Sequence, residues 1–183
     1  NVPGNIYVVG NTILDNLIDI KTSYNDNVIV TMHRRENHFQ IKKYFEVINK
    51  LAKDNSHLNF ILPIHPNPNV FKHKDILTNV DVVSPIPYNK MLNLLAECKI
   101  IISDSGGIQE EASFFNKKVI VCREITERPE SIGVHSFMCS SPNKLEDMFY
   151  NILDNFEVNK ECPYGDGYAS DKILKILKGV FNV

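Results

Sequence analysis

Features that would place a protein in a membrane, in an oxidising compartment or on nucleic acid are missing from this sequence. No apolar run approaches the length of a membrane span. The four cysteines stand far apart without a Cys-x-x-Cys pair, so we expect reduced, mostly buried thiols and no metal site. A formal net charge of −2 offers no positive field to nucleic acid or to an anionic membrane. We therefore expect a cytoplasmic protein without nucleic-acid or membrane partners.

Two common nucleotide-binding fingerprints are also absent. The chain contains neither Gly-x-Gly-x-x-Gly nor Gly-x-x-x-x-Gly-Lys-Ser/Thr, which argues against a dinucleotide enzyme and against a P-loop ATPase. It has no internal repeat and no low-complexity tract. Its 183 residues, of which 43% are hydrophobic and 23% charged, are typical of one globular domain with a substantial core.

The rest of the chain is organised around residues 99–112, where a strand passes through a tight turn into a helix. Residues 100–102 are three isoleucines, which favour a buried strand, and Ser105-Gly106-Gly107 follow at the turn. The first N–H groups of a helix are unpaired and its dipole favours an anion, so this turn is a candidate phosphate site. Glu111 lies about one and a half turns further along, where it could accept hydrogen bonds from sugar hydroxyls. The competing interpretation is an ordinary helix cap and turn.

Strand and helix patterns alternate along the chain. The expected strands are residues 6–9, 28–32, 58–64, 80–84, 100–102, 118–122 and 136–139. Mostly unbroken apolar strands separated by helices predict a Rossmann-like α/β domain, a parallel sheet with helices on both faces. Residues 1–20 are interpreted as the end of a preceding domain with its linker helix, and residues 21–183 as the Rossmann-like domain.

Polar clusters follow several of these strands and should gather at one edge of the sheet. His33 is a candidate general acid or base, and Arg34 a candidate phosphate partner; a solvated charged loop is the alternative. His65 also follows a strand, although a lone histidine there is more often structural. Tyr88 and Met91 either form a flat wall for an aromatic base or pack into the core. Residues 123–130 form a further charged loop, for which a surface salt-bridge cluster is the alternative.

Six motifs in this order resemble UDP-N-acetylglucosamine 2-epimerase of the bacterial, non-hydrolysing type, over nearly the whole chain. They are Val9-Gly10-Asn11-Thr12 with Asp15; Thr31-Met32-His33-Arg34-Arg35-Glu36-Asn37; His65-Pro66-Asn67; Ser103-Asp104-Ser105-Gly106-Gly107-Ile108-Gln109-Glu110-Glu111; Arg123 with Thr126-Glu127-Arg128-Pro129-Glu130; and Pro163-Tyr164-Gly165-Asp166-Gly167 with Ala169-Ser170. Each motif alone is weak, but six in register are specific.

The resemblance implies the C-terminal half of a two-domain GT-B architecture, with the active site between two Rossmann-like domains. The family interconverts UDP-GlcNAc and UDP-ManNAc by eliminating and re-adding UDP, without metal or nicotinamide. A homodimer and a role in surface polysaccharide synthesis are also implied. Matching residue by residue, His33 is the catalytic histidine, and Arg34 and His65 contact a second, regulatory UDP-GlcNAc. The turn at Ser105, Gly106 and Gly107 binds diphosphate, Glu111 binds ribose, and Tyr88 and Met91 lie beside the uracil.

The chain departs from the family pattern in two places. The loop after Glu130 is shorter and carries Gly133-Val134 where the family has Gly-Thr, and Met91 replaces a commonly aromatic residue. The family's N-terminal domain, which supplies acidic catalytic residues, is not matched. We therefore expect this chain to bind UDP weakly and to turn over nothing alone. The alternatives are a GT-B glycosyltransferase domain and a non-catalytic sugar-nucleotide-binding module.

Overall fold

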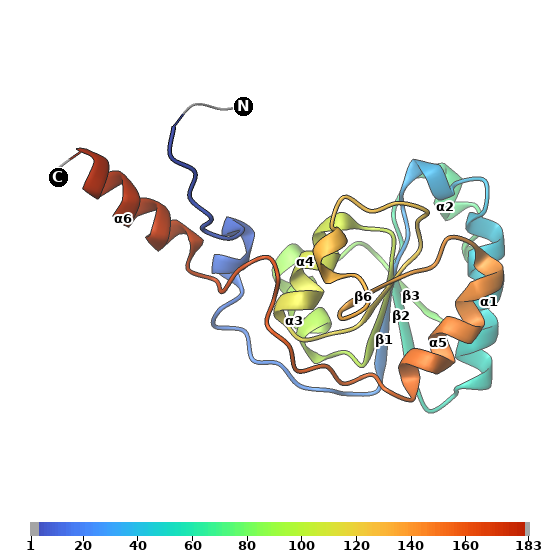
Figure 1. Cartoon of the computed structure of the whole chain (residues 1–183). Helices are drawn as coiled ribbons and strands as arrows, with labels where there is room; N and C mark the ends of the chain where they lie inside the picture. Colours follow the sequence, from blue (N-terminus) through green and yellow to red (C-terminus); the bar gives the residue numbers. More distant parts are fainter. Residues whose placement is uncertain (1–3, 182–183) are drawn as a thin grey trace.

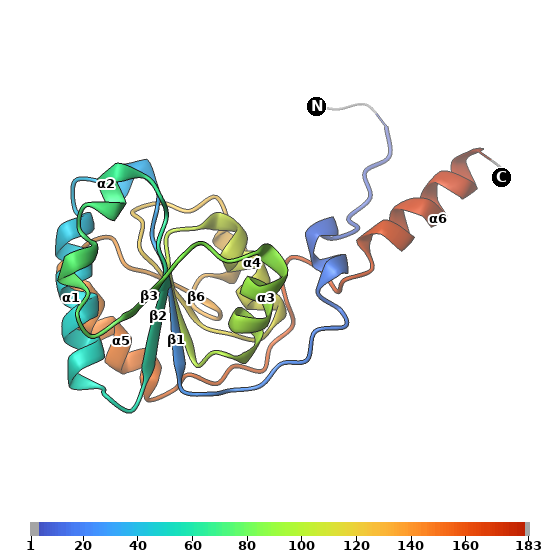
Figure 2. The ribbon, with the colours of Figure 1, turned by 180° about the vertical axis from the view of Figure 1, so that it is seen from behind.

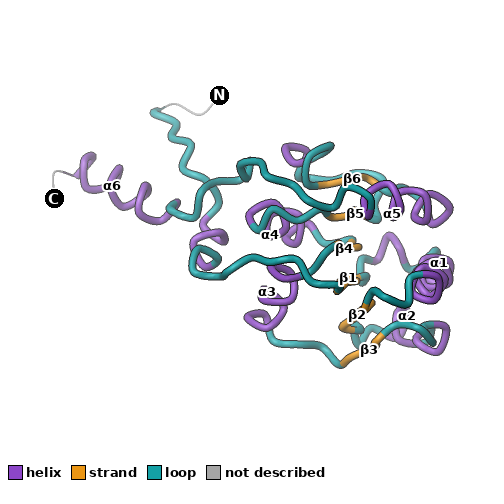
Figure 3. The backbone as a smooth tube through the Cα atoms, turned by 90° about the horizontal axis from the view of Figure 1, so that it is seen from below, coloured by secondary structure: helices purple, strands orange, loops and turns teal. Residues whose placement is uncertain are grey.

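The computed structural model describes residues 4–181, and a six-stranded parallel sheet lies at its centre. The strands are β1 (Asn27–Thr31), β2 (Asn59–Pro63), β3 (Asp81–Val83), β4 (Ile100–Ser103), β5 (Val119–Val121) and β6 (Ser136–Met138). Their spatial order is β3-β2-β1-β4-β5-β6, and every neighbouring pair is parallel (Figure 3). The order reverses between β1 and β4, which is where open sheets of this kind bind ligands.

Helices cover both faces of the sheet, as the sequence predicts. Helices α1 (Ile41–Asp54) and α5 (Leu145–Leu153) lie on one face, while α3 (Tyr88–Glu97) and α4 (Gly106–Phe114) lie on the other (Figures 1 and 2). The short helix α2 (Pro68–Phe71) follows β2. The predicted Rossmann-like α/β fold is confirmed.

The strands are apolar throughout because both of their faces are covered. Val28 and Val30 of β1 pack toward α1 and α5, whereas Ile29 between them packs toward α3 and α4. All four residues of β4 and all three of β5 are buried. β-Branched side chains suit this position because they pack well on a pleated surface.

The prediction of a strand at residues 6–9 is wrong. Residues 5–10 have no regular secondary structure, and Ile6 and Val8 are 81% and 96% exposed. A strand needs a neighbour for its hydrogen bonds, and none of the strands within residues 4–181 pairs with this segment. The expected linker helix is a short 3₁₀ helix, η1 (Thr12–Asn16), whose start is capped by the side chain of Asn11.

The segment around η1 is fastened to the start of the last helix, α6 (Ala169–Phe181). The carboxylate of Asp15 accepts hydrogen bonds from the backbone N–H groups of Ala169 (2.9 Å) and Ser170 (2.7 Å). Gly10 and Gly165 pass so closely that a Cβ on Gly165 would lie 3.0 Å from the Cα of Gly10. Helix α6 then extends away from the sheet beside the N-terminal segment (Figures 1 and 2).

The cysteines lie as the sequence predicts. All four cysteines are free thiols, and Cys98, Cys122 and Cys139 are buried, as predicted. No helix in the described part of the chain is both long enough and apolar enough to cross a membrane.

Candidate functional site

The turn between β4 and α4 is built by short polar side chains at the carboxyl ends of β1 and β4. Thr31 and Ser103 share a hydrogen bond of 2.7 Å between their hydroxyl oxygens, and Ser103 Oγ also accepts from the N–H of Ser105 (3.0 Å). Ser105 occupies the N-cap position of α4, but its hydroxyl makes no capping hydrogen bond. The N-terminal turn of α4 can therefore offer backbone N–H groups to a ligand.

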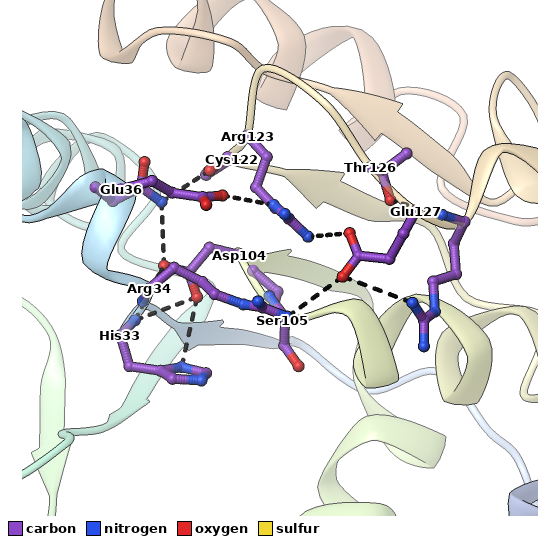
Figure 4. A network of polar contacts seen from close by, with 12 residues as sticks. His33, Arg34, Glu36, Asp104, Ser105, Cys122, Arg123, Thr126 and Glu127 are labelled. Carbon is purple, nitrogen blue, oxygen red and sulfur yellow. Dashed lines mark hydrogen bonds and ion pairs between the residues drawn. The ribbon is translucent and has the colours of Figure 1, made fainter.

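Asp104 holds the segment after β1 against the end of β4. Its side chain is fully buried and accepts hydrogen bonds from the N–H of His33 (3.0 Å), the N–H of Arg34 (2.9 Å) and the side-chain amide of Asn37 (3.1 Å; Figure 4). The same amide donates to the carbonyl of Cys122 just after β5. One carboxylate thus fixes the positions from which His33 and Arg34 project.

His33 and His65 lie together, although they follow different strands. Their rings are stacked, with centroids 5.5 Å apart and planes inclined by 15°. The Nδ1 atom of His33 lies 3.4 Å from Asp104 Oδ1, which favours a proton on Nδ1 and leaves Nε2 for a ligand. His65 Nδ1 accepts from the N–H of Asn67 (3.1 Å).

The carboxylate of Glu127, beside the start of α4, lies near three arginines, of which Figure 4 labels Arg34 and Arg123. Arg123 Nη1 contacts Oε2 at 2.6 Å, while Arg34 Nη2 and Arg128 Nη1 lie 3.7 and 3.6 Å from Oε1. A hydrogen bond from the backbone of Glu127 itself and the contact with Arg123 lower the pKa of this carboxyl, against the opposing effect of burial. A Cβ placed on Gly106 would lie 3.3 Å from Oε1. The absence of a side chain at Gly106 thus leaves room for a negative group at the helix start.

A second ion pair connects this cluster to the N-terminal segment. Glu110 is 7% exposed; its carboxylate accepts from Arg128 Nε and from Asn11 Nδ2, both at 2.6 Å. The hydroxyl of Tyr164 donates to the carbonyl of Arg128 at 3.1 Å. Sequence reasoning assigned no roles to Glu110, Glu127 and Arg128, although all three lie within the quoted motifs.

Glu111 lies inside α4 and faces Tyr88 at the start of α3. The Tyr88 hydroxyl donates to Glu111 Oε1 at 2.7 Å. Burial raises the pKa of Glu111, and the hydrogen bond from Tyr88 opposes that rise. The Tyr88 side chain is 49% exposed, and Met91 on the next turn is half-buried. Tyr88 and Met91 can therefore form a flat surface beside the start of α4, next to the carboxylate of Glu111.

The fold therefore brings the predicted site residues from separate parts of the chain to one edge of the sheet. Their roles stay predictions. Ser105, Gly106 and Gly107 form the helix start; Gly107 is exposed, and a Cβ placed on it would meet no atom within 4 Å. No group of three or more His, Cys, Asp or Glu side chains within residues 4–181 is placed to hold a metal ion.

Comparisons with known proteins agree on one family. Residues 1–178 match the family model described as UDP-N-acetylglucosamine 2-epimerase. The chain is 39% identical over 162 residues to UDP-N-acetylglucosamine 2-epimerase of Neisseria meningitidis, covering 82% of this chain and 44% of the relative. It is 32% identical over 207 residues to that of Campylobacter jejuni, covering 94% of this chain and 54% of the relative. The chain thus spans about half the length of these relatives.

Solved structures show the same likeness. The crystal structure of UDP-GlcNAc 2-epimerase from Neisseria meningitidis bound to UDP-GlcNAc aligns with a TM-score of 0.80 and 32% identity, covering 92% of this chain and 54% of that one. A putative UDP-N-acetylglucosamine 2-epimerase from Listeria monocytogenes aligns with a TM-score of 0.84 and 30% identity, covering 100% of this chain and 55% of that one.

Proposed function

The chain belongs to the UDP-N-acetylglucosamine 2-epimerase family, and we propose that it is the nucleotide-binding half of an enzyme that interconverts UDP-GlcNAc and UDP-ManNAc. The observation that carries this proposal is the start of α4. It offers backbone N–H groups without side-chain capping, lies beside a Glu127 carboxylate that is near three arginines, and has the Glu111 carboxylate further along the same helix. A nucleoside diphosphate matches this arrangement because it presents an anion, two ribose hydroxyls and a flat base.

In this proposal the diphosphate lies at the start of α4. Its oxygens accept from the N–H groups near Gly106 and Gly107, and the ribose hydroxyls donate to Glu111. Tyr88 and Met91 lie beside the uracil, where Met91 supplies a softer contact than an aromatic ring would. The Neisseria relative, whose structure holds UDP-GlcNAc, supports a UDP-sugar as the ligand class.

The proposed chemistry removes UDP and adds it back. A base takes the proton from C2 of the sugar while the bond from C1 to the diphosphate oxygen breaks, which yields a 2-acetamidoglucal and UDP. Negative charge develops on the leaving diphosphate, where the helix N–H groups stabilise it. With a proton on each ring nitrogen, His33 donates the Nε2 proton to the leaving diphosphate as the bond breaks. Return of the proton to the other face of C2, with re-addition of UDP, completes the epimerisation.

Acidic groups from a second domain complete this site. Two apolar surfaces support such a domain: Leu174, Leu177 and Val180 on α6 are 51%, 46% and 61% exposed, and Ile6 and Val8 are exposed as well. Both belong to the segments that extend from the sheet on the same side (Figure 1). We therefore expect no epimerase activity from residues 1–183 alone.

We also propose that Arg34 and His65 contact a second UDP-GlcNAc.

Calorimetric titration of the 183-residue chain with UDP tests this function. Ser105→Ala should weaken UDP binding about 10-fold or more, because in this proposal its hydroxyl donates to a charged diphosphate oxygen. Glu111→Ala should weaken it about 10-fold or more, because hydrogen bonds to a charged group are stronger. His33→Ala should leave the affinity unchanged, since its role is chemical.

The matched control is Glu46→Ala, which removes an exposed glutamate from α1 on the other face of the sheet. It should bind UDP like the unsubstituted chain. UDP binding that is insensitive to both Ser105→Ala and Glu111→Ala would place the nucleotide elsewhere and refute the proposal.

A further inference from the structure

We propose that Glu127 is a displaceable internal anion: without ligand, its carboxylate fills the position of a phosphate group at the start of α4, and an incoming diphosphate must expel it. This inference rests on the proposed function, because it concerns the same nucleotide site. It assigns to Glu127 a role in setting ligand affinity and charge selectivity.

The position of one oxygen atom carries the argument. Glu127 Oε1 lies 3.7 Å from Arg34 Nη2 and 3.6 Å from Arg128 Nη1, and it is the atom closest to a Cβ built on Gly106, at 3.3 Å. Two cations and a helix start thus converge on a single anionic oxygen (Figure 4). A phosphate oxygen would be attracted to the same point by the same three groups.

The contacts of Glu127 suit a group that leaves. It lies on the irregular segment after β5, and its side chain is 45% exposed, so it can rotate into solvent. Its short contact is made through Oε2 to Arg123, at 2.6 Å, and Arg123 also has Glu36 at 2.6 Å. Arg123 therefore remains paired after Glu127 departs.

Glu127 contacts Arg34 and Arg128 through Oε1 at longer distances than it contacts Arg123 through Oε2. Both distances exceed ordinary hydrogen-bond length, whereas Arg128 keeps a separate contact of 2.6 Å with the buried Glu110. Departure of Glu127 thus exposes Arg34 and Arg128 to a ligand while Arg128 stays in place.

This arrangement predicts selection by charge. A ligand must bring enough negative charge to replace the carboxylate, which a diphosphate does and a neutral nucleoside does not. Because the carboxylate competes for the same cations, the apparent affinity is lower than that of an empty site. Removing the charge of Glu127 should therefore strengthen diphosphate binding, whereas substituting a residue that contacts the ligand would weaken it.

The test compares Glu127→Gln and Glu127→Ala with Glu124→Gln. Glu124 is an exposed glutamate of the same loop, and its substitution changes the net charge equally while leaving the contacts of Glu127 with the three arginines in place. Each protein is titrated calorimetrically with UDP, with uridine and with inorganic diphosphate. We expect both Glu127 variants to bind UDP and diphosphate about tenfold more tightly, equivalent to about 1.4 kcal/mol. Glu124→Gln should bind both ligands like the unsubstituted chain.

The outcomes separate this inference from the proposed function. If the Glu127 variants bind inorganic diphosphate no more tightly than Glu124→Gln, the inference is overturned whatever UDP does. If they gain affinity for diphosphate but UDP binds no better than diphosphate, the internal anion stands and the nucleotide function fails. Absence of binding of either ligand to every variant overturns both.

Discussion

Loss of the Asp104 carboxylate is expected to destabilise the protein strongly. This side chain is fully buried and lies outside the contacts proposed for the nucleotide. It accepts from two backbone N–H groups, of His33 and Arg34, and from the amide of Asn37. Asp104→Asn keeps the size of the side chain but replaces one acceptor oxygen by an NH2 group. That group is a donor and would lie among the donors that now bind the carboxylate.

The magnitude follows from these three bonds. A hydrogen bond to a charged group contributes about 1.5–3 kcal/mol, and a buried donor left unpaired costs about 1–3 kcal/mol. All three donors face Oδ2, and an amide oxygen in that position has two lone pairs for them, so at least one bond is lost and one donor is left unpaired. We expect Asp104→Asn to lower the free energy of unfolding by about 3 kcal/mol.

Urea unfolding followed by circular dichroism measures this loss. With a denaturant slope of about 2 kcal/mol per molar urea, the midpoint should fall by about 1.5 M. Asp19→Asn, at an exposed position before β1, is the matched control and should unfold like the unsubstituted chain. If Asp104→Asn stays within about 0.5 kcal/mol of that control, Asp104 does not organise the segment after β1.

Three further changes follow from the same structure. Gly106→Ala should weaken UDP binding because its methyl group, 3.3 Å from Glu127 Oε1, crowds the anion position; calorimetry showing unchanged affinity would contradict this. The pKa of His135 is lowered mainly by burial, so the folded state binds fewer protons than the unfolded state near the ordinary value of 6.5. Thermal stability should therefore fall as the pH drops from about 7.5 to about 5.5, and less in His135→Gln; equal slopes would refute it. Tyr88→Phe removes a hydrogen bond that lowers the pKa of Glu111, so this carboxyl group should take up its proton at a higher pH. As the pH is lowered, UDP binding should therefore begin to weaken at a higher pH than in the unsubstituted chain; identical pH profiles would count against the contact.

Local sequence patterns determined the elements of this protein. Runs such as residues 100–102 and 119–121 predicted buried parallel strands because β-branched side chains suit a sheet that is covered on both faces. The turn and helix start at Ser105, Gly106 and Gly107 were also predictable from the sequence, because a tight turn and a helix start depend on residues that are neighbours in the chain. Where pairing matters, local pattern failed: residues 6–9 are apolar, yet among residues 4–181 they lack a neighbouring strand.

Only the tertiary structure decided how the charged groups combine. The sequence indicated His33, Arg34 and the loop 123–130 as polar clusters, but not that Asp104 would anchor the first or that Glu127 would lie among three arginines. Apolar periodicity identifies which face of an element is buried because burial repeats along the element. A charged side chain in a loop carries no such period, and its partner is set by strand order, which brings the ends of β1, β4 and β5 together.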